Sequence, residues 1–300
     1  MVEPVDAIIA GVNKAGTTSL YVSLAEHPDI VPSAIKETRY FLPARYGQAL
    51  RPVAVWDDYF VAADRPVRLE ATPSYFYGGA AVAHAIRSTL ANPRVIISLR
   101  EPVSRAVSFF EYQKVRLRLP RELTIEEYLA QADALADRDF DDPQNERYMA
   151  VRGGRYADWL QDWLDVLGAE SVKVVYFEDL IDRGVATLIE VVEWLGLDPA
   201  PVESGGLRSE NRTTSFKNAR LQRVALGFND GAERLLRRLP GLKRAMRSAY
   251  FALNGRAVDA SAVSEAVIAE LRDRFVEPNA RLAAMLDAAG VARPPWLPTD

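Results

Sequence analysis

A glycine-containing stretch near the start of the chain has residue types that bind phosphate. "GVNKAGTTSL", residues 11–20, directly follows the apolar run "VDAIIA". Gly11 and Gly16 keep the spacing of the GxxxxGK[ST] loop of nucleoside triphosphatases, but the lysine, Lys14, lies inside the loop. Backbone N–H groups of a tight loop and of a helix N-terminus form a cradle for an anion. We therefore expect a phosphate site here, in which Lys14 and the hydroxyls that follow Gly16 contribute.

A second candidate anion site follows another apolar run, "RVIISL". Arg100 comes at the end of this run, where a charge is costly unless it is paired or near the surface. Its planar guanidinium suits a phosphate. Ser108 lies in the helix expected after Pro102, and Arg105 lies one turn before it. From these residues alone, a salt-bridged arginine and an ordinary helical serine remain an equal alternative.

The segment "KETRYF", residues 36–41, places a carboxylate between two cations. Glu37 lies between Lys36 and Arg39 in a stretch with no helical or strand periodicity. A carboxylate in such a place can act as a general base and accept a proton from a substrate. A solvated charge cluster is the simpler interpretation of these six residues by themselves.

Alternating apolar runs and amphipathic stretches predict the elements that position these residues. Runs at 5–11, 94–100 and 171–180, and a shorter one within 66–76, are typical of buried strands. One helix is expected at 20–27, capped by Thr17 or Thr18, and another is expected to begin at Pro102. Further helices are expected at 81–90, 156–168, 185–197, 219–252 and 261–289. Residues 29–41 are expected to be irregular, and the acidic residues 131–147 are expected to form a surface loop that acts as a lid.

This order of elements predicts an α/β fold. Strands that alternate with helices form a mainly parallel sheet covered by helices on both faces, and ligands lie at the carboxyl ends of the strands. We expect a single P-loop-like domain over residues 1–300, with its core at about 5–290.

Composition excludes several classes of function. The net charge of −4 argues against general nucleic-acid binding, and the absence of cysteine excludes disulfides and thiolate metal sites. No secretory signal and no apolar run of membrane-spanning length is found, so we expect a cytoplasmic protein without stable membrane insertion. The basic, amphipathic residues 233–254 leave open an interfacial helix, although Pro240 interrupts them.

Taken together, five segments resemble sulfotransferases that use 3′-phosphoadenosine 5′-phosphosulfate (PAPS). The segments are "GVNKAGTTSLYVSLAEHPDI", "KETRYF", "EATPSYF", "RVIISLREPVSRAVSFF" and "NRTTSFKNARL", in the order and spacing of that family. The pattern is most similar to the bacterial branch related to the heparan sulfate N- and 3-O-sulfotransferase domains. The resemblance covers roughly residues 5–290.

The resemblance implies roles for the matching positions. The 5′-phosphosulfate would be bound by Lys14, Ala15, Gly16, Thr17, Thr18 and Ser19. The 3′-phosphate would be bound by Arg100 and Ser108. Glu37 would be the general base, and Lys36 would lie beside the transferring group. Lys217 and Arg220 resemble, more loosely, the segment that closes over the nucleotide. The product would be 3′,5′-diphosphoadenosine, and no metal ion would be required.

One departure from the family pattern bears on the acceptor. The 3-O-sulfotransferases carry a lysine after the glutamate of an "EKxPxYF" segment, whereas Ala71 stands at that position here. We therefore expect a hydroxyl, with an amine as second choice, on a small-molecule, glycoside or lipid-like acceptor in place of a long polyanion.

The alternative enzyme is a P-loop small-molecule kinase that uses ATP and magnesium. This alternative rests on "VVYFED" (174–179), which resembles a strand that ends in an acidic residue able to hold a metal ion. The sequence leaves the oligomeric state open.

Overall fold

The computed structural model describes residues 4–61, 65–205, 214–216, 255–257 and 263–297. The chain forms two compact units. Unit 1 comprises residues 1–105, 153–210 and 273–300, and unit 2 comprises residues 106–152 and 211–272. A single domain over residues 1–300 stays a prediction. Within the described ranges, no helix is long and apolar enough to cross a membrane.

Unit 1 contains a five-stranded sheet in which every pairing is parallel. Its strands are β1 (Val5–Gly11), β2 (Ile30–Pro32), β3 (Val67–Ala71), β4 (Pro93–Leu99) and β5 (Val172–Tyr176), in the spatial order β2-β3-β1-β4-β5. From the central strand β1 the chain goes to the edge strand β2, returns to β3 between them, and then continues on the other side of β1 with β4 and β5. The carboxyl ends of all five strands share one edge, and the reversal of strand order at β1 is where such folds bind ligands.

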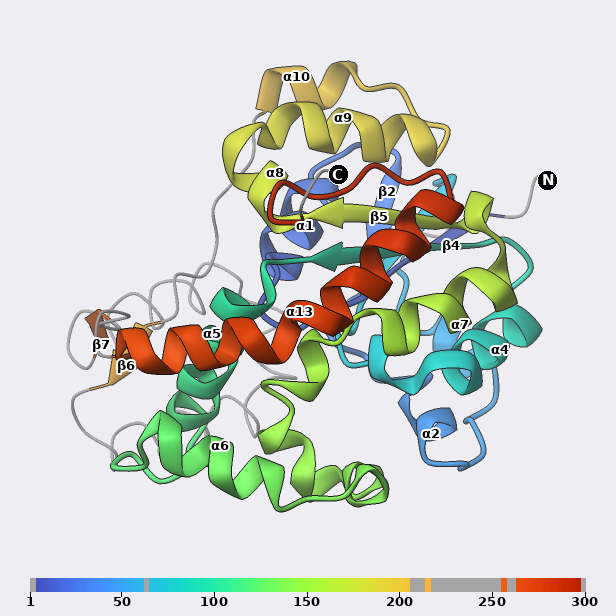
Figure 1. Cartoon of the computed structure of the whole chain (residues 1–300). Helices are drawn as coiled ribbons and strands as arrows, with labels where there is room; N and C mark the ends of the chain where they lie inside the picture. Colours follow the sequence, from blue (N-terminus) through green and yellow to red (C-terminus); the bar gives the residue numbers. More distant parts are fainter. Residues whose placement is uncertain (1–3, 62–64, 206–213, 217–254, 258–262, 298–300) are drawn as a thin grey trace. The chain divides into compact units, whose positions relative to one another are not determined.

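Helices cover the sheet of unit 1 on both sides. Its helices are α1 (Thr17–Leu24), α2 (Leu42–Arg45), α3 (Ala54–Asp57), α4 (Gly79–Thr89), α7 (Ala157–Leu167), α8 (Phe177–Asp182), α9 (Gly184–Trp194) and α10 (Ala200–Gly205). Figure 1 shows α9 and α10 on one side of the strands, with α4 and α7 on the other. The core on the α9 side joins Ala7 and Leu69 of the sheet to Leu20 of α1 and Val191 of α9. The expected α/β fold with a covered parallel sheet is confirmed.

Two long helices have residues in both units. They are α5 (Pro102–Val115) and α13 (Glu265–Ala288). Pro102 begins α5, as its fixed φ allows at the first helical position.

The described part of unit 2 contains several short elements in addition to its residues of α5 and α13. It contains α6 (Ile125–Asp133), the 3-10 helices η2 (Asp137–Asp141) and η3 (Pro143–Tyr148), and an antiparallel pair formed by β6 (Thr214–Phe216) and β7 (Gly255–Ala257). Thr124 and Glu127 form a capping box that fixes the start of α6. The prediction of a plain surface loop over 131–147 is wrong: this stretch completes α6 and forms both 3-10 helices, and Phe140 within it is buried.

Three other local predictions need correction. Residues 29–41 are not wholly irregular, since they contain β2, which is too short to show a strand period. The strand expected at 171–180 stops at Tyr176 because α8 begins at Phe177, where its two acids are favourable at a helix N-terminus. Neither Thr17 nor Thr18 caps α1, because Gly16 takes the cap position. The helix expected at 219–252 lies outside the described residues.

Candidate active site

The loop between β1 and α1 is held tightly against its neighbours. Lys14 and Gly16 both have left-handed backbone, with φ of 73° and 75°. A Cβ on Gly16 would lie 2.9 Å from the ring of Phe177, so the loop needs glycine there. The Ser98 hydroxyl of β4 donates to the Ala15 carbonyl at 2.5 Å, and the Ser98 carbonyl accepts from Val12 N at 2.8 Å. The loop is therefore fastened to the strand beside β1.

The helix that follows this loop, α1, has a positive N-terminus, and its own first turn contains no group that neutralises it. No side chain caps α1, and its first turn contains no acidic residue. Thr17 is buried, while Thr18 and Ser19 are half-buried beside it. A helix N-terminus of this kind favours an anion through its N–H groups and its dipole.

Two cations converge at the same loop. An Arg100 guanidinium N–H donates to the Lys14 carbonyl at 3.1 Å, and the guanidinium lies 4.4 Å from the Phe177 ring centroid. Burial, together with the positive charge of Arg100, lowers the pKa of Lys14 to about 8. Two adjacent, partly desolvated cations repel each other, and a bound phosphate would relieve that cost. The residues present therefore fit an anionic, phosphate-bearing ligand.

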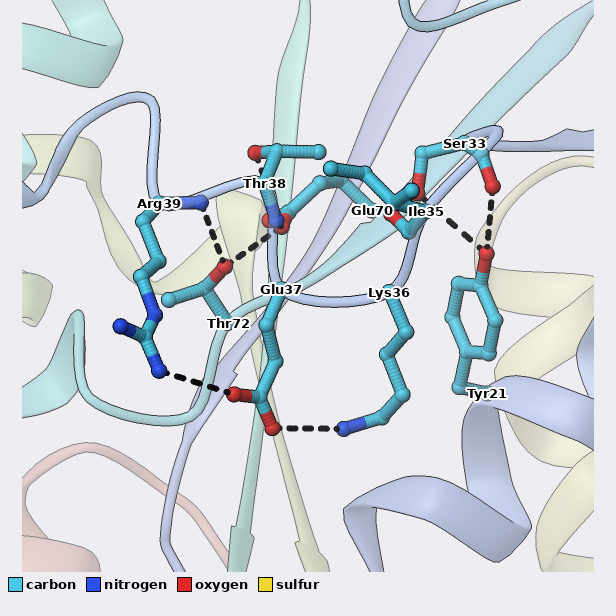
Figure 2. Close-up of polar contacts among 9 residues, drawn as sticks. All are labelled: Tyr21, Ser33, Ile35, Lys36, Glu37, Thr38, Arg39, Glu70 and Thr72. Carbon is cyan, nitrogen blue, oxygen red and sulfur yellow. Dashed lines mark hydrogen bonds and ion pairs between the residues drawn. The ribbon is translucent and has the colours of Figure 1, made fainter. Parts of the chain in front are cut away.

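The predicted base, Glu37, stands on a strained surface segment after β2. Its φ is 63°, and that of Arg39 is 55°, both in the left-handed region. Lys36 Nζ lies 3.2 Å from Glu37 Oε1, and an Arg39 guanidinium nitrogen lies 3.7 Å from Glu37 Oε2. Figure 2 shows the carboxylate held between these two cations. The structure therefore contains the charge cluster, and the Glu37 side chain within it is 41% exposed, which leaves it open to a substrate.

A second carboxylate, to which the sequence motifs assign no role, lies beneath this segment. Glu70 of β3 is fully buried. Its Oε1 accepts from Thr38 N at 3.0 Å, from the Thr38 hydroxyl at 3.1 Å and from the Thr72 hydroxyl at 2.5 Å. Burial raises the pKa of Glu70 to about 7, against these hydrogen bonds and the charge of Lys36, which lower it. The available signal was a charged residue inside the otherwise strand-like run "VRLEA".

The remaining predicted site residues are placed less fully. Ser108 lies half-buried on α5 within unit 2, so its sharing of one phosphate with Arg100 stays a prediction. Lys217 and Arg220 lie outside the described residues.

The acids that a kinase would use have other partners. The Glu178 carboxylate accepts from Glu101 N at 3.0 Å and from Trp296 Nε1 at 3.1 Å. Asp179 pairs with Arg183 at 3.1 Å. Both acids therefore take part in contacts that hold α8 and its neighbours in place.

The chain matches a known family over most of its length. The family model described as "Sulfotransferase domain" matches residues 4–227, so the chain belongs to the sulfotransferase domain family. The likeness predicted from the five sequence segments is thereby confirmed.

Relatives and a solved structure agree with this assignment. Mouse heparan sulfate glucosamine 3-O-sulfotransferase 6 is 30% identical over 193 residues, which is 64% of this chain and 52% of the relative. Human heparan sulfate glucosamine 3-O-sulfotransferase 3B1 is 30% identical over 64% of this chain and 46% of the relative. The match thus spans about half the length of these relatives. A sulfotransferase from Alicyclobacillus acidocaldarius shares the fold, with a TM-score of 0.58 and 24% identity over 79% of this chain and 95% of that one.

Proposed function

We propose that this chain transfers a sulfuryl group from PAPS to a hydroxyl group, with an amine as second choice, and releases 3′,5′-diphosphoadenosine. The observation that carries the proposal is the pair of adjacent cations, Lys14 and Arg100, beside the uncapped N-terminus of α1. Membership of the sulfotransferase domain family supports PAPS as the donor. The strand order supports this location for the donor site, since the loop follows the central strand β1 and Arg100 follows its neighbour β4.

The proposed chemistry is an in-line displacement at sulfur. The acceptor oxygen forms a bond to sulfur as Glu37 takes its proton, and the bond between sulfur and the bridging phosphate oxygen breaks. The leaving phosphate gains negative charge, which Lys14 neutralises, with Lys36 beside the transferring group. Catalysis then rests on position and electrostatics, as in phosphoryl transfer. The transferred group carries a single charge, so no bridging metal ion is required in this scheme.

The donor would be held at both of its ends. Residues 14–19 would bind the 5′-phosphosulfate, and Arg100 would bind the 3′-phosphate that distinguishes this donor from ATP.

The acceptor proposed is a small molecule, a glycoside or a lipid-like compound. Ala71 is fully buried at the end of β3, so the position that holds a lysine in the family's "EKxPxYF" segment offers no charge here. The net charge of −4 also disfavours a long polyanion. The relatives named for heparan sulfate therefore indicate the reaction type more than the acceptor.

A transfer screen tests this function. The chain is incubated with PAPS and a panel of hydroxylated metabolites, glycosides and lipids, and products are detected by the added mass of one SO₃ group. We expect transfer to uncharged hydroxyl compounds, with heparan sulfate oligosaccharides as the polyanionic arm of the panel. Phosphoryl transfer from ATP and magnesium, with none from PAPS, would contradict the proposal and favour the kinase.

A further inference from the structure

The segment that carries Glu37 lacks regular secondary structure, yet four of its backbone N–H groups have partners in one short stretch of chain. That stretch is residues 70–75, which begins in β3 and continues past its end. The hydrogen bonds are Glu37 N to Ala71 O at 2.9 Å, Thr38 N to Glu70 Oε1 at 3.0 Å, Arg39 N to Thr72 Oγ1 at 3.2 Å, and Phe41 N to Tyr75 OH at 3.1 Å. Figure 2 shows Glu70 and Thr72 joined to Thr38 and Arg39. The segment "EATPSY" thus serves as a template for the segment "KETRYF".

Glu70 is the centre of this template. A single oxygen, Oε1, receives three donors, two from Thr38 and one from the Thr72 hydroxyl. Its other oxygen, Oε2, is buried and has no hydrogen-bond partner among the described residues. A fully buried carboxylate with one unsatisfied oxygen is costly, and such a group in a folded protein calls for an explanation. A neutral or shorter side chain would avoid that cost, so stability does not explain the choice of glutamate.

The backbone held by this template is strained at two places. Glu37 and Arg39 are both left-handed without being glycine or asparagine, a conformation that persists only where the surroundings impose it. Thr38 lies between them, and both its backbone N–H and its hydroxyl donate to Glu70. The bonds at Thr38 and Arg39 therefore fix the direction in which the Glu37 side chain leaves the chain.

We propose that Glu70, acting with Thr72, is a positioning residue that imposes the left-handed turn at 37–39 and so aims the Glu37 carboxylate at the acceptor. This inference rests on the proposed function of Glu37 as general base. Glu70 itself touches no substrate, because it is fully buried. The ionised form serves best, because a carboxylate accepts stronger hydrogen bonds than a neutral group does.

Three titratable groups act electrostatically on Glu70 or face it. Lys36, on the held segment, lowers the pKa of Glu70 by its positive charge. Tyr75 on the template and Tyr21 on α1 have pKa values raised by burial and by the charge of Glu70, so both stay neutral in the physiological range. With the pKa of Glu70 raised to about 7 by burial, its protonation is expected to weaken the template below neutral pH.

The test compares matched variants at Thr72, where one hydroxyl both donates to Glu70 and accepts from Arg39 N. Thr72→Val removes the hydroxyl at constant shape, and Thr72→Ser keeps it. Thr187→Val on α9 removes another buried threonine hydroxyl and serves as the control. The readouts are kcat, the affinity for 3′,5′-diphosphoadenosine, and hydrogen exchange at the amides of residues 38 and 39. Glu70→Gln is measured in the same way and over a range of pH.

We expect Thr72→Val and Glu70→Gln to lower kcat by about 10- to 100-fold, as small misplacements of a catalytic group do. Amide exchange at 38 and 39 is expected to be faster in both, with unchanged affinity for 3′,5′-diphosphoadenosine. Thr72→Ser is expected to keep most of the turnover. The fall in wild-type kcat below about pH 7 should be absent in Glu70→Gln.

Two results overturn the inference. One is a wild-type level of kcat in Thr72→Val and Glu70→Gln. The other is a loss of nucleotide affinity as large as the loss of kcat, which would indicate general damage. Amide exchange is measured without any reaction, so it tests the template even if the wild-type chain transfers no sulfate. A wild-type chain that transfers no sulfate would instead reject the proposed function.

Discussion

The donor loop (residues 12–16) and the base segment (residues 36–41) both follow strands of the same sheet, but they are held in opposite ways. The donor loop is fixed by hydrogen bonds to the hydroxyl and the carbonyl of Ser98 and by close packing of Gly16 against Phe177. Its Lys14 comes shortly before an uncapped helix N-terminus, and Arg100 donates to the Lys14 carbonyl. In the base segment, the N–H groups of Thr38 and Arg39 are bound to side chains beneath it, and its charged side chains pair with one another.

This difference corresponds to two different tasks. A loop that binds an anion must leave N–H groups and positive charge for the ligand, so its support has to come from carbonyls and packing. A segment that presents a carboxylate must hold it in one fixed direction, so its backbone N–H groups form hydrogen bonds with the residues beneath it. The unsatisfied oxygen of Glu70 is the cost of the second arrangement.

Glu37→Gln breaks the base segment at its functional group and has the largest expected effect. We expect kcat to fall by about 10²–10⁴-fold, because the variant cannot accept a proton. Affinity for 3′,5′-diphosphoadenosine should be unchanged, as measured by calorimetry. Glu193→Gln, at an exposed position on α9, is the control and should behave as wild type. Retained turnover in Glu37→Gln would assign the base to another residue.

Lys14→Ala breaks the donor loop instead. Removal of a group that stabilises developing charge typically costs about 10²–10³ in kcat, and we expect a loss in that range. The loss of donor affinity should be smaller, since the helix N-terminus and Arg100 remain. Lys173→Ala on β5 is the matched control. Equal losses in turnover and in binding would mean that Lys14 only binds.

Arg100→Ala tests the second cation of the donor site. Charge-assisted hydrogen bonds contribute about 1.5–3 kcal/mol, so affinity for 3′,5′-diphosphoadenosine should fall by about 10- to 100-fold. Affinity for adenosine 5′-phosphate, which lacks the 3′-phosphate, should change much less. A wild-type protein that binds the two nucleotides equally would contradict this role. Arg183→Ala, which removes ion pairs with Asp179 of α8 and Glu190 of α9, is the control.

Lys14 is expected to give the donor loop its own pH dependence of kcat/KM, distinct from that of the base segment. Burial, with the nearby charge of Arg100, lowers the pKa of Lys14 to about 8, so the free enzyme loses this charge as the pH rises past that value. We expect kcat/KM for PAPS to fall above about pH 8. In Lys14→Arg the fall should vanish, since arginine stays charged at that pH. An unchanged alkaline limb in that variant would assign the limb to another group.

The smallest expected effect concerns stability and the base segment. Burial raises the pKa of Glu70 from 4.5 to about 7, so the folded state holds a proton that the unfolded state has released in this window. The contribution of Glu70 to the free energy of unfolding should therefore be highest below about pH 4.5, and it should fall as the pH rises to about 7. The change is expected to be about 1–3 kcal/mol. Denaturant titrations should show it in wild type and not in Glu70→Gln.

The sequence predicts the donor side of the site better than the base side. The spacing of Gly11, Lys14 and Gly16 after an apolar run is enough to predict an anion loop, because strand, loop and helix are consecutive. The template under Glu37 depends on residues 32 positions away in the chain, brought close by the pairing of β2 with β3. Local periodicity contains no information on such a pairing. β2 itself, three residues long, was missed for the same reason.

Direct binding of nucleotides tests the central claim, that the loop with the displaced lysine binds a PAPS-type donor. The affinity of the wild-type chain is measured for 3′,5′-diphosphoadenosine and for ADP, each with magnesium and with a chelator. The account predicts tight binding of 3′,5′-diphosphoadenosine that the chelator leaves unchanged and that Lys14→Ala and Arg100→Ala weaken. Preference for ADP with magnesium, lost on chelation, would contradict it.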